Sequence, residues 1–295
     1  MTALEGNARL QAYFASAPTR QGILARRLLG QPSADDSRLA KELARRLAGE
    51  IRADGSVGGA FVSTAWAIVE LHDLGGDPAA ATRLSDWLLA RQEAPGRFGE
   101  GCTPPRHAGR TCEHFMKGFF AVAPATERVS PLTVPTGKVI RSEGTARFAA
   151  SCLALRAVIL AGQVSHGGVR EHIQSLAVAA TASLPTDHYP MEFVVASLST
   201  LAHVRQEESA VGAYRDLLLK RQKEDGTWSG LDSFMTLEAL MAEGSEKALQ
   251  AVRKAIPSLL ASQRRDGTFG ALARQERALI GLEAMLGRPS RSPSV

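Results

Sequence analysis

The chain has few cysteines, few aromatic residues and no long apolar run. Three cysteines among 295 residues are too few for a disulfide framework and are typical of a reducing compartment. Its first residues, Met1-Thr2-Ala3-Leu4-Glu5, have no basic segment followed by an apolar run, so we expect no signal peptide and a cytoplasmic protein. No segment is apolar over the length of a membrane span, which excludes a transmembrane segment and leaves peripheral membrane contact open.

The charge is nearly balanced, with a formal net charge of +5. Basic residues are scattered along the chain and do not alternate with aromatic residues, as nucleic-acid sites require. We therefore expect no nucleic-acid partner. A mild positive excess suits an anionic group such as a phosphate or a lipid headgroup, so we expect the ligand to be an apolar or amphiphilic small molecule.

An internal repeat is the most informative feature that is present. Gln92–Phe98, Gln222–Trp228 and Gln263–Phe269 all contain a Gln, three residues, a Gly, one residue and an aromatic. Glycines recur at one constant interval from Gly55 through Gly96 to Gly137, and again from Gly226 to Gly267. The remaining length has room for further copies, so the pattern predicts six units.

Two kinds of helix alternate along these units. Residues 37–52 place leucines on a single stripe of a polar helix, which predicts an outer helix. Residues 60–71, 146–161 and 191–204 are apolar on almost every side, as inner helices must be. Further outer helices are expected at 79–92, 169–184, 210–222 and 245–263, and further inner ones at 112–122, 233–242 and 275–286.

The alternation predicts an all-α protein, an (α/α)6 toroid with six inner and six outer helices. Each Gln-Gly-aromatic segment ends an outer helix, because its glycine supplies the left-handed residue that stops it. Three prolines in residues 124–137 predict a loop or a short helix there. We expect a helical N-terminal extension at 1–32, the toroid at 33–287 and a frayed tail rich in Pro and Ser at 288–295.

The three repeated segments resemble the QW motif of the terpenoid cyclase and protein prenyltransferase superfamily. The resemblance covers most of the chain and implies the toroid, with a working cavity where the turns lead into the inner helices. It is less specific for a reaction, because triterpene cyclases, prenyltransferase β-subunits and complement domains share the fold.

The family's catalytic signatures are missing. Neither the DxDD motif of class II cyclases nor the magnesium-binding DDxxD motif occurs in the sequence. Prenyltransferases hold zinc with Asp, Cys and His at successive inner-helix starts, whereas Phe61-Val62-Ser63-Thr64 has neither Asp nor Cys. The resemblance therefore implies a fold without transferring a known active site, and the sequence does not show whether a partner subunit is needed.

One long turn concentrates metal-binding residue types. Cys102, His107, Cys112 and His114 form a Cys2His2 set, of the kind that binds tetrahedral zinc. Their spacing matches no standard zinc motif, so the alternative is a proline-stiffened loop whose thiols are incidental.

Polar residues just after the turns are candidates for catalysis. We expect Glu113 or Asp232 to transfer a proton, with Asp187 and His188 taking part. Helix capping explains Asp232 equally well. Candidates for substrate binding are the aromatic residues of the inner helices and one arginine, although core packing is the alternative for the aromatics: Trp66, Phe115, Phe119, Phe148 and Arg147.

Two functions remain open from the sequence. The first is a terpenoid cyclase- or prenyltransferase-like enzyme that acts on an isoprenoid or similar apolar substrate in the toroid cavity, with zinc as its metal. The second is a non-catalytic helical toroid that binds a peptide, lipid or protein partner, in which any zinc is structural.

Overall fold

The helices of this chain follow the periodicity of its apolar residues. The computed structural model describes residues 3–93, 119–124, 126–182 and 191–287. Within these ranges the strands are two short ones, β1 (Leu132–Thr133) and β2 (Val139–Ile140), which form an antiparallel hairpin. The all-α class predicted from the sequence is therefore confirmed.

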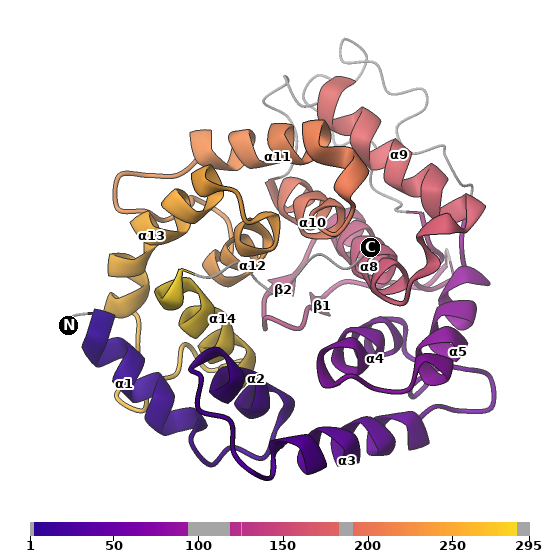
Figure 1. Cartoon of the computed structure of the whole chain (residues 1–295). Helices are drawn as coiled ribbons and strands as arrows, with labels where there is room; N and C mark the ends of the chain where they lie inside the picture. Colours follow the sequence, from indigo (N-terminus) through magenta and orange to yellow (C-terminus); the bar gives the residue numbers. More distant parts are fainter. Residues whose placement is uncertain (1–2, 94–118, 125, 183–190, 288–295) are drawn as a thin grey trace.

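Two sets of helices alternate along the described residues (Figure 1). The outer set contains α1 (Ala3–Phe14), α3 (Asp36–Gly49), α5 (Pro78–Leu89), α9 (Gly167–Ala182), α11 (Glu208–Lys220) and α13 (Glu246–Ala261). The inner set, called the inner ring below, contains α2 (Arg20–Leu28), α4 (Phe61–Leu74), α8 (Glu143–Leu160), α10 (Met191–Leu201), α12 (Ser233–Glu243) and α14 (Arg274–Leu286). Short 3-10 turns, η1 (Gln163–Ser165) and η2 (Arg205–Glu207), precede α9 and α11.

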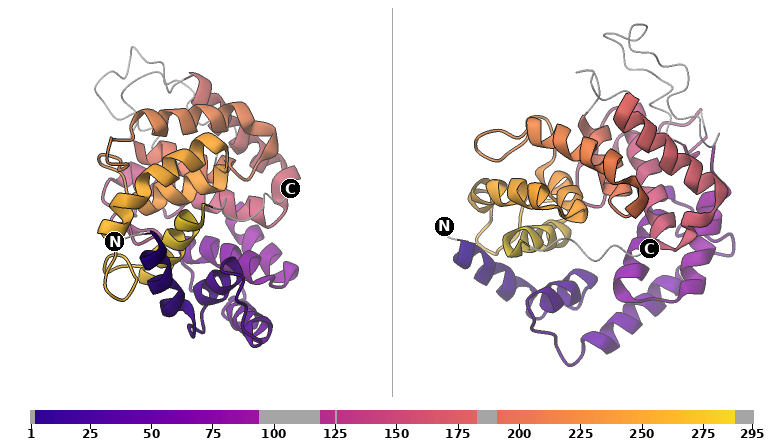
Figure 2. Two further views of the ribbon diagram at one scale, coloured as in Figure 1. Left: turned by 60° about the vertical axis from the view of Figure 1, so that its left-hand side comes forward. Right: turned by 45° about the horizontal axis from the view of Figure 1, so that its top comes forward.

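The inner ring is closed by helix contacts. In chain order α2 contacts α4, α4 contacts α8, and the series continues through α10, α12 and α14 back to α2. Turned views show the outer helices lying over this ring (Figure 2). The first helix takes part as well, since α1 contacts α13 and α14. The predicted extension at 1–32 thus packs in the same way as the other helix pairs.

Apolar content explains which helix lies in which layer. Along α8, Ala150, Leu155 and Val158 are fully buried although they lie on different sides of the helix. On α3, by contrast, Ala40 and Ala44 are buried while Lys41 and its polar neighbours are exposed. A helix that packs on several sides must be apolar on several sides, whereas a helix on the outside needs one stripe.

The repeated segments fold as one kind of turn. Gln222 pairs with Trp228, and Gln263 with Phe269, through isolated antiparallel bridges. The Gln222 side-chain amide donates to the carbonyl oxygens of Gly226, at 3.0 Å, and of Ala251 on α13, at 2.8 Å. The glutamine thus joins the end of one outer helix to the next outer helix.

The same arrangement closes the ring. The Gln263 amide donates to the carbonyl oxygens of Gly267, at 3.0 Å, and of Gly6 on α1, at 3.2 Å. The last outer helix is therefore fastened to the first by the same residue type in the same turn.

The third copy differs from the sequence-based prediction. Gln92 pairs with Phe120, and the Glu93 amide donates to the Phe119 carbonyl at 3.1 Å. Phe120 thus takes the position that Trp228 has in its turn, and Phe119 takes that of Thr227. Phe98, the aromatic expected to complete this copy, lies outside the described residues. The assignment of 112–122 as an inner helix is wrong for its described part, because 119–122 form the bridge and a bend. A long insertion therefore separates the two halves of this turn.

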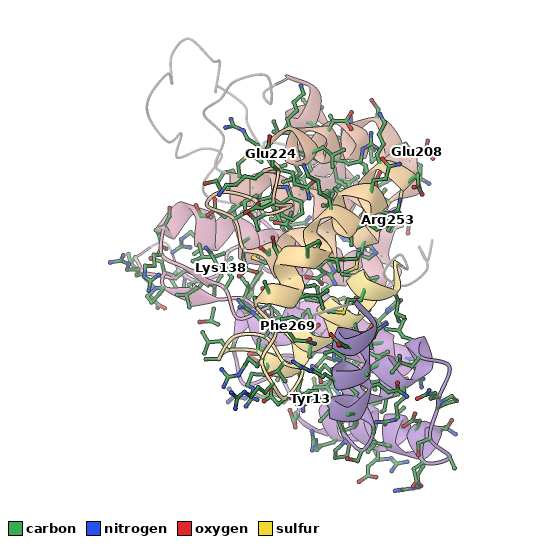
Figure 3. All side chains as sticks on the ribbon, turned by 90° about the vertical axis from the view of Figure 1, so that its left-hand side faces the viewer. Tyr13, Lys138, Glu208, Glu224, Arg253 and Phe269 are labelled. Atoms are coloured by element: carbon green, nitrogen blue, oxygen red, sulfur yellow. The ribbon has the colours of Figure 1, made fainter. Side chains whose placement is uncertain are left out.

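The region from Pro124 to Gly137 forms a loop and a hairpin tip, as its prolines predict. Gly137 has a positive φ of 78° and donates to the Val134 carbonyl at 2.8 Å, while Val134 donates to Lys138 at 3.0 Å. Figure 1 shows the hairpin inside the opening of the inner ring. In Figure 3, Lys138 of this hairpin lies toward the same side of the molecule as Glu224, and Glu208 lies toward the other side.

Candidate functional site

An apolar recess lies inside the inner ring, next to the hairpin. Its volume is about 60 Å³, and residues of α4 and α12, which are not neighbours in the ring, both line it. The lining consists mainly of apolar side chains with one charged pair at the edge: Trp66, Val134, Pro135, Thr136, Ala149, Cys152, Leu153, Arg156, Val195, Ala196, Ser199, Thr200, Met235 and Glu238.

The charged pair joins α8 to α12. The Arg156 guanidinium donates to Glu238 at 2.8 Å and to the Ser199 hydroxyl of α10 at 3.0 Å. Both charged side chains are mostly buried, with exposed fractions of 14% and 18%. A buried charge needs such partners, because water no longer solvates it. The pair therefore links three inner helices across the ring.

A second space, the charged cavity, adjoins the recess and shares Trp66, Arg156 and Glu238 with it. Its volume is about 40 Å³. Besides the three shared residues, its lining combines charged and apolar side chains: Arg20, Val69, His72, Asp73, Leu160, His203, Ala242, Glu276, Ile280 and Glu283.

Arg20 organises the carboxylates of this cavity. Its side chain, only 4% exposed, forms ion pairs with Asp73 and Glu276 and lies 3.5 Å from Glu70. Its guanidinium also lies over the Trp66 ring, 5.0 Å from the centroid. Burial by itself would lower the pKa of Arg20, but the three carboxylates outweigh that effect and raise it. Arg20 thus stays charged while buried.

Burial shifts the pKa values of two neighbouring groups. Burial raises the pKa of the Glu70 carboxyl, and the attraction of Arg20 opposes this only in part. Burial lowers the pKa of His203 to about 3, with Arg156 and His72 adding to the effect and Asp73 opposing it. The His203 Nε2 atom is buried and has no hydrogen-bond partner within the described residues. Its imidazole is therefore neutral near pH 7.

The hairpin is fastened over the recess by Arg277 of α14. Arg277 donates to the Thr136 carbonyl at 2.6 Å and to Asp232 at 2.9 Å. A Cβ atom at Gly137 would lie 3.0 Å from Ala273 and Leu272, so the hairpin tip contacts the start of α14 closely. Since Thr136 lines the recess, this contact fixes one of its walls.

Asp232 is engaged as a helix cap. Its Oδ1 accepts from the amides of Phe234 and Met235, each at 3.1 Å, and its Oδ2 accepts from Arg277. It lines a separate pocket of about 380 Å³ beside α12 and α13. It is part of neither the recess nor the charged cavity. Helix capping and the ion pair with Arg277 explain these side-chain contacts, and proton transfer by Asp232 stays a prediction.

The predicted substrate-binding residues are placed in different surroundings. Trp66 lines both the recess and the charged cavity. Phe119 and Phe148 are buried in an aromatic cluster, where Phe148 stacks on Phe193 at 4.1 Å and Phe119 lies 4.5 Å from His172. Neither phenylalanine is part of the lining of the recess or the charged cavity.

Arg147 holds a loop in place. It donates to Glu143 at 2.8 Å and to the carbonyl oxygens of Ala123, at 3.1 Å, and Glu127, at 2.5 Å. These contacts fix the segment that leads from the Phe120 bridge into α8, and they occupy most of the guanidinium donors.

The other predicted site residues lie outside the described ranges. These are the candidate zinc ligands, two aromatic or acidic neighbours and two polar residues: Cys102, His107, Cys112, His114, Glu113, Phe115, Asp187 and His188. Over the ranges that the structure does describe, no group of three or more His, Cys, Asp or Glu side chains is placed to hold a metal ion. The zinc site therefore stays a prediction.

The sequence analysis did not predict the charged residues inside the inner ring. Glu70, Arg156, Glu238 and Glu283 each stand inside an otherwise apolar stretch of an inner helix. A single charge in such a stretch was the available signal, because a charge on a buried helix must find partners inside the fold.

No family model matches the chain, and no curated protein matches it either. None of the helices in the described part of the chain has the length and apolar character that crossing a bilayer requires.

Proposed function

We propose that the chain is an (α/α)6 toroid of the terpenoid cyclase and protein prenyltransferase type. The closed series of inner-helix contacts and the hydrogen bonds by which two turn glutamines, Gln222 and Gln263, hold the next outer helix support this proposal. The proposed toroid includes α1 and α2 as its first pair, so it begins near Ala3 and does not start at residue 33.

Within this toroid, the recess is proposed to hold the end of an isoprenoid chain or a similar apolar molecule. The single observation that carries the proposal is the apolar lining of a space inside the ring, with Trp66, Leu153, Val195 and Met235 around it. Pockets that enclose a whole ligand of drug size measure about 300–1,000 Å³. A space of about 60 Å³ instead suits a branched hydrocarbon end of a few carbon atoms.

The contacts favour binding over catalysis by the recess residues. Proton transfer to an alkene needs a protonated acid. Glu238, the carboxyl in the lining, already accepts a hydrogen bond from Arg156 at 2.8 Å and serves as its counter-ion. A cyclase or prenyltransferase reaction would therefore depend on residues outside the recess, namely Glu113, Asp232, Asp187 or His188, with zinc at the Cys102 to His114 loop if metal takes part.

Farnesol binding tests the proposal. Tryptophan emission of the purified chain is titrated with farnesol, using Trp66→Phe to show that the signal comes from the recess and not from Trp87 or Trp228. Saturable quenching is expected, because the ligand end would lie beside the indole. Farnesyl diphosphate, titrated in parallel, shows whether an anionic head strengthens binding.

A pair of variants places the ligand. Ala149→Leu fills the recess from α8, whereas Ala79→Leu adds the same carbon atoms at an exposed position of α5. We expect farnesol affinity to fall at least tenfold in the first variant, which corresponds to about 1.4 kcal/mol of binding free energy. In the second variant the affinity should stay unchanged. Absence of saturable binding, or equal affinity in both variants, would refute the proposal.

A further inference from the structure

The charged cavity carries an excess of negative charge inside the fold. Four carboxylates line it, from Asp73, Glu238, Glu276 and Glu283, and two guanidinium groups face them, from Arg20 and Arg156. Because burial removes the water that would stabilise charge, such an excess is costly until a cation enters.

A second, independent feature of the cavity also points to a ligand. His203 belongs to the lining, is 9% exposed and has a buried Nε2 atom with no hydrogen-bond partner among the described residues. The groups that act on the titration of its imidazole, Arg156, His72 and Asp73, all line the same cavity. A buried polar atom without a partner destabilises the fold, and a bound hydrogen-bonding group would remove that cost.

The size and the walls of the cavity limit the cation. One water molecule needs about 10–15 Å³ of such space, so about 40 Å³ holds a group of about three heavy atoms. Val69, Leu160, Ala242 and Ile280 supply apolar wall around the charged groups. A metal ion fits less well, since the described side chains offer no group of metal ligands.

We propose that the charged cavity is a binding site for a primary ammonium group on a short alkyl stem. The ammonium donates to the carboxylates that line the cavity, and the neutral His203 supplies a further acceptor. The alkyl stem lies along the apolar wall formed by α4, α8, α12 and α14. This site is separate from the recess, and it does not depend on farnesol binding there.

Butylammonium chloride is the probe for this site: its nitrogen and first two carbon atoms match the volume of the cavity, and its last two carbon atoms extend beyond it. We expect it to raise the melting temperature of the full chain in a saturable manner, and isothermal calorimetry gives its Kd. Butanol and sodium butyrate match the probe in length but are neutral or negatively charged, so they should have no saturable effect. Stabilisation by butanol equal to that by butylammonium would overturn the proposal, because it would show that charge plays no part.

Variants assign the binding to the cavity. Glu283→Gln removes one carboxylate with almost no change of shape, and Ala242→Leu fills the cavity while every charge remains. Each should weaken butylammonium binding at least tenfold, whereas Glu224→Gln, on an exposed turn, should bind as the wild type does. Ala242→Leu keeps the test decisive if Glu283→Gln does not fold.

Three outcomes would overturn the inference. The first is that both Glu283→Gln and Ala242→Leu bind butylammonium with wild-type affinity. The second is that the wild-type chain shows no saturable response to butylammonium. The third is that manganese chloride raises the melting temperature and the amine does not. Loss of farnesol binding in the recess with intact butylammonium binding would refute the proposed function alone.

Discussion

Arg156 of α8 and Glu238 of α12 meet at 2.8 Å inside the inner ring, and both the recess and the charged cavity include them in their walls. These helices are separated in the ring by α10, which contributes Ser199 as a second acceptor for Arg156. The pair thus connects two inner helices that are not direct neighbours, and it does so by charge instead of by apolar packing.

Removing one member of this pair should destabilise the fold. Glu238→Gln leaves the Arg156 charge mostly buried without its counter-ion, so we expect a loss of about 2–3 kcal/mol in the free energy of unfolding. That figure is below the range for fully buried pairs because 14–18% of these side chains remains exposed. Urea denaturation measures the change.

The double variant Arg156→Met with Glu238→Leu is the matched control. It replaces both charges by apolar side chains, and we expect its stability to lie within about 1 kcal/mol of the wild type. We attribute the destabilisation of Glu238→Gln to the unpaired Arg156 charge and not to lost packing. A double variant that is no more stable than Glu238→Gln would contradict this.

The turn glutamines should stabilise the ring through their side-chain amides. Gln222→Ala removes hydrogen bonds to Gly226 and Ala251, and we expect a loss of about 1–2 kcal/mol from these two bonds together. Gln250→Ala, on the exposed side of α13, should change stability by less than about 0.5 kcal/mol. Equal effects of the two substitutions in thermal or urea unfolding would count against the fastening role.

Gly226 should tolerate no side chain. Its φ is +81°, and a Cβ atom there would lie 2.2 Å from the Lys254 carbonyl oxygen of α13. Gly226→Ala is expected to cost about 3 kcal/mol or more, from backbone strain together with displacement of α13.

Gly230 separates these two contributions. It has a similar φ of +77° but nothing within 4 Å of an added Cβ, so Gly230→Ala should cost only about 1 kcal/mol. If both alanine variants lose the same stability by urea denaturation, the close approach of the turn to α13 is not what requires glycine.

His172 should make the fold sensitive to acid. Its ring is fully buried beside Phe119, with both nitrogens lacking partners in the described part of the chain, and burial lowers its pKa from 6.5 to about 4. Below pH 6.5 the unfolded chain therefore binds a proton that the folded chain does not, so stability falls as the pH drops from 6.5 toward 4.

His172→Phe removes this proton linkage and keeps a ring in the aromatic cluster. The loss of stability between pH 6.5 and 4 should shrink by up to about 3 kcal/mol, measured by urea denaturation at each pH. His166→Gln, at an exposed position, should leave the pH profile unchanged. An unchanged profile in His172→Phe would show that the buried imidazole is not the titrating group.

Sequence periodicity predicted the layers of helices but not every turn. The stripe on residues 37–52 and the apolar sides of 146–161 correspond to α3 and α8, because burial on one face or on several faces leaves a direct record in the sequence. Gln92 was matched with Phe98, its nearest aromatic in the repeat pattern. The actual partner, Phe120, follows an insertion, and local spacing carries no information on such a distant pairing.

The candidate site was harder to predict for a related reason. The place of Trp66 on an inner helix predicts a site residue, and Trp66 lines both the recess and the charged cavity. Arg20 was not, because its partners Glu276 and Asp73 are brought to it only when the ring closes. Ion pairs between residues so far apart in sequence depend on tertiary geometry, which local patterns do not encode.

The hydrogen bond from Gln263 to the Gly6 carbonyl has a consequence for the order of folding. It joins segments 257 positions apart in the chain, so the ring cannot close until the turn that contains Gln263 has been synthesised. During synthesis α1 emerges before α13 and α14, and its contacts with them must wait until they follow. Helix pairs that are neighbours in sequence can form earlier than this closing contact.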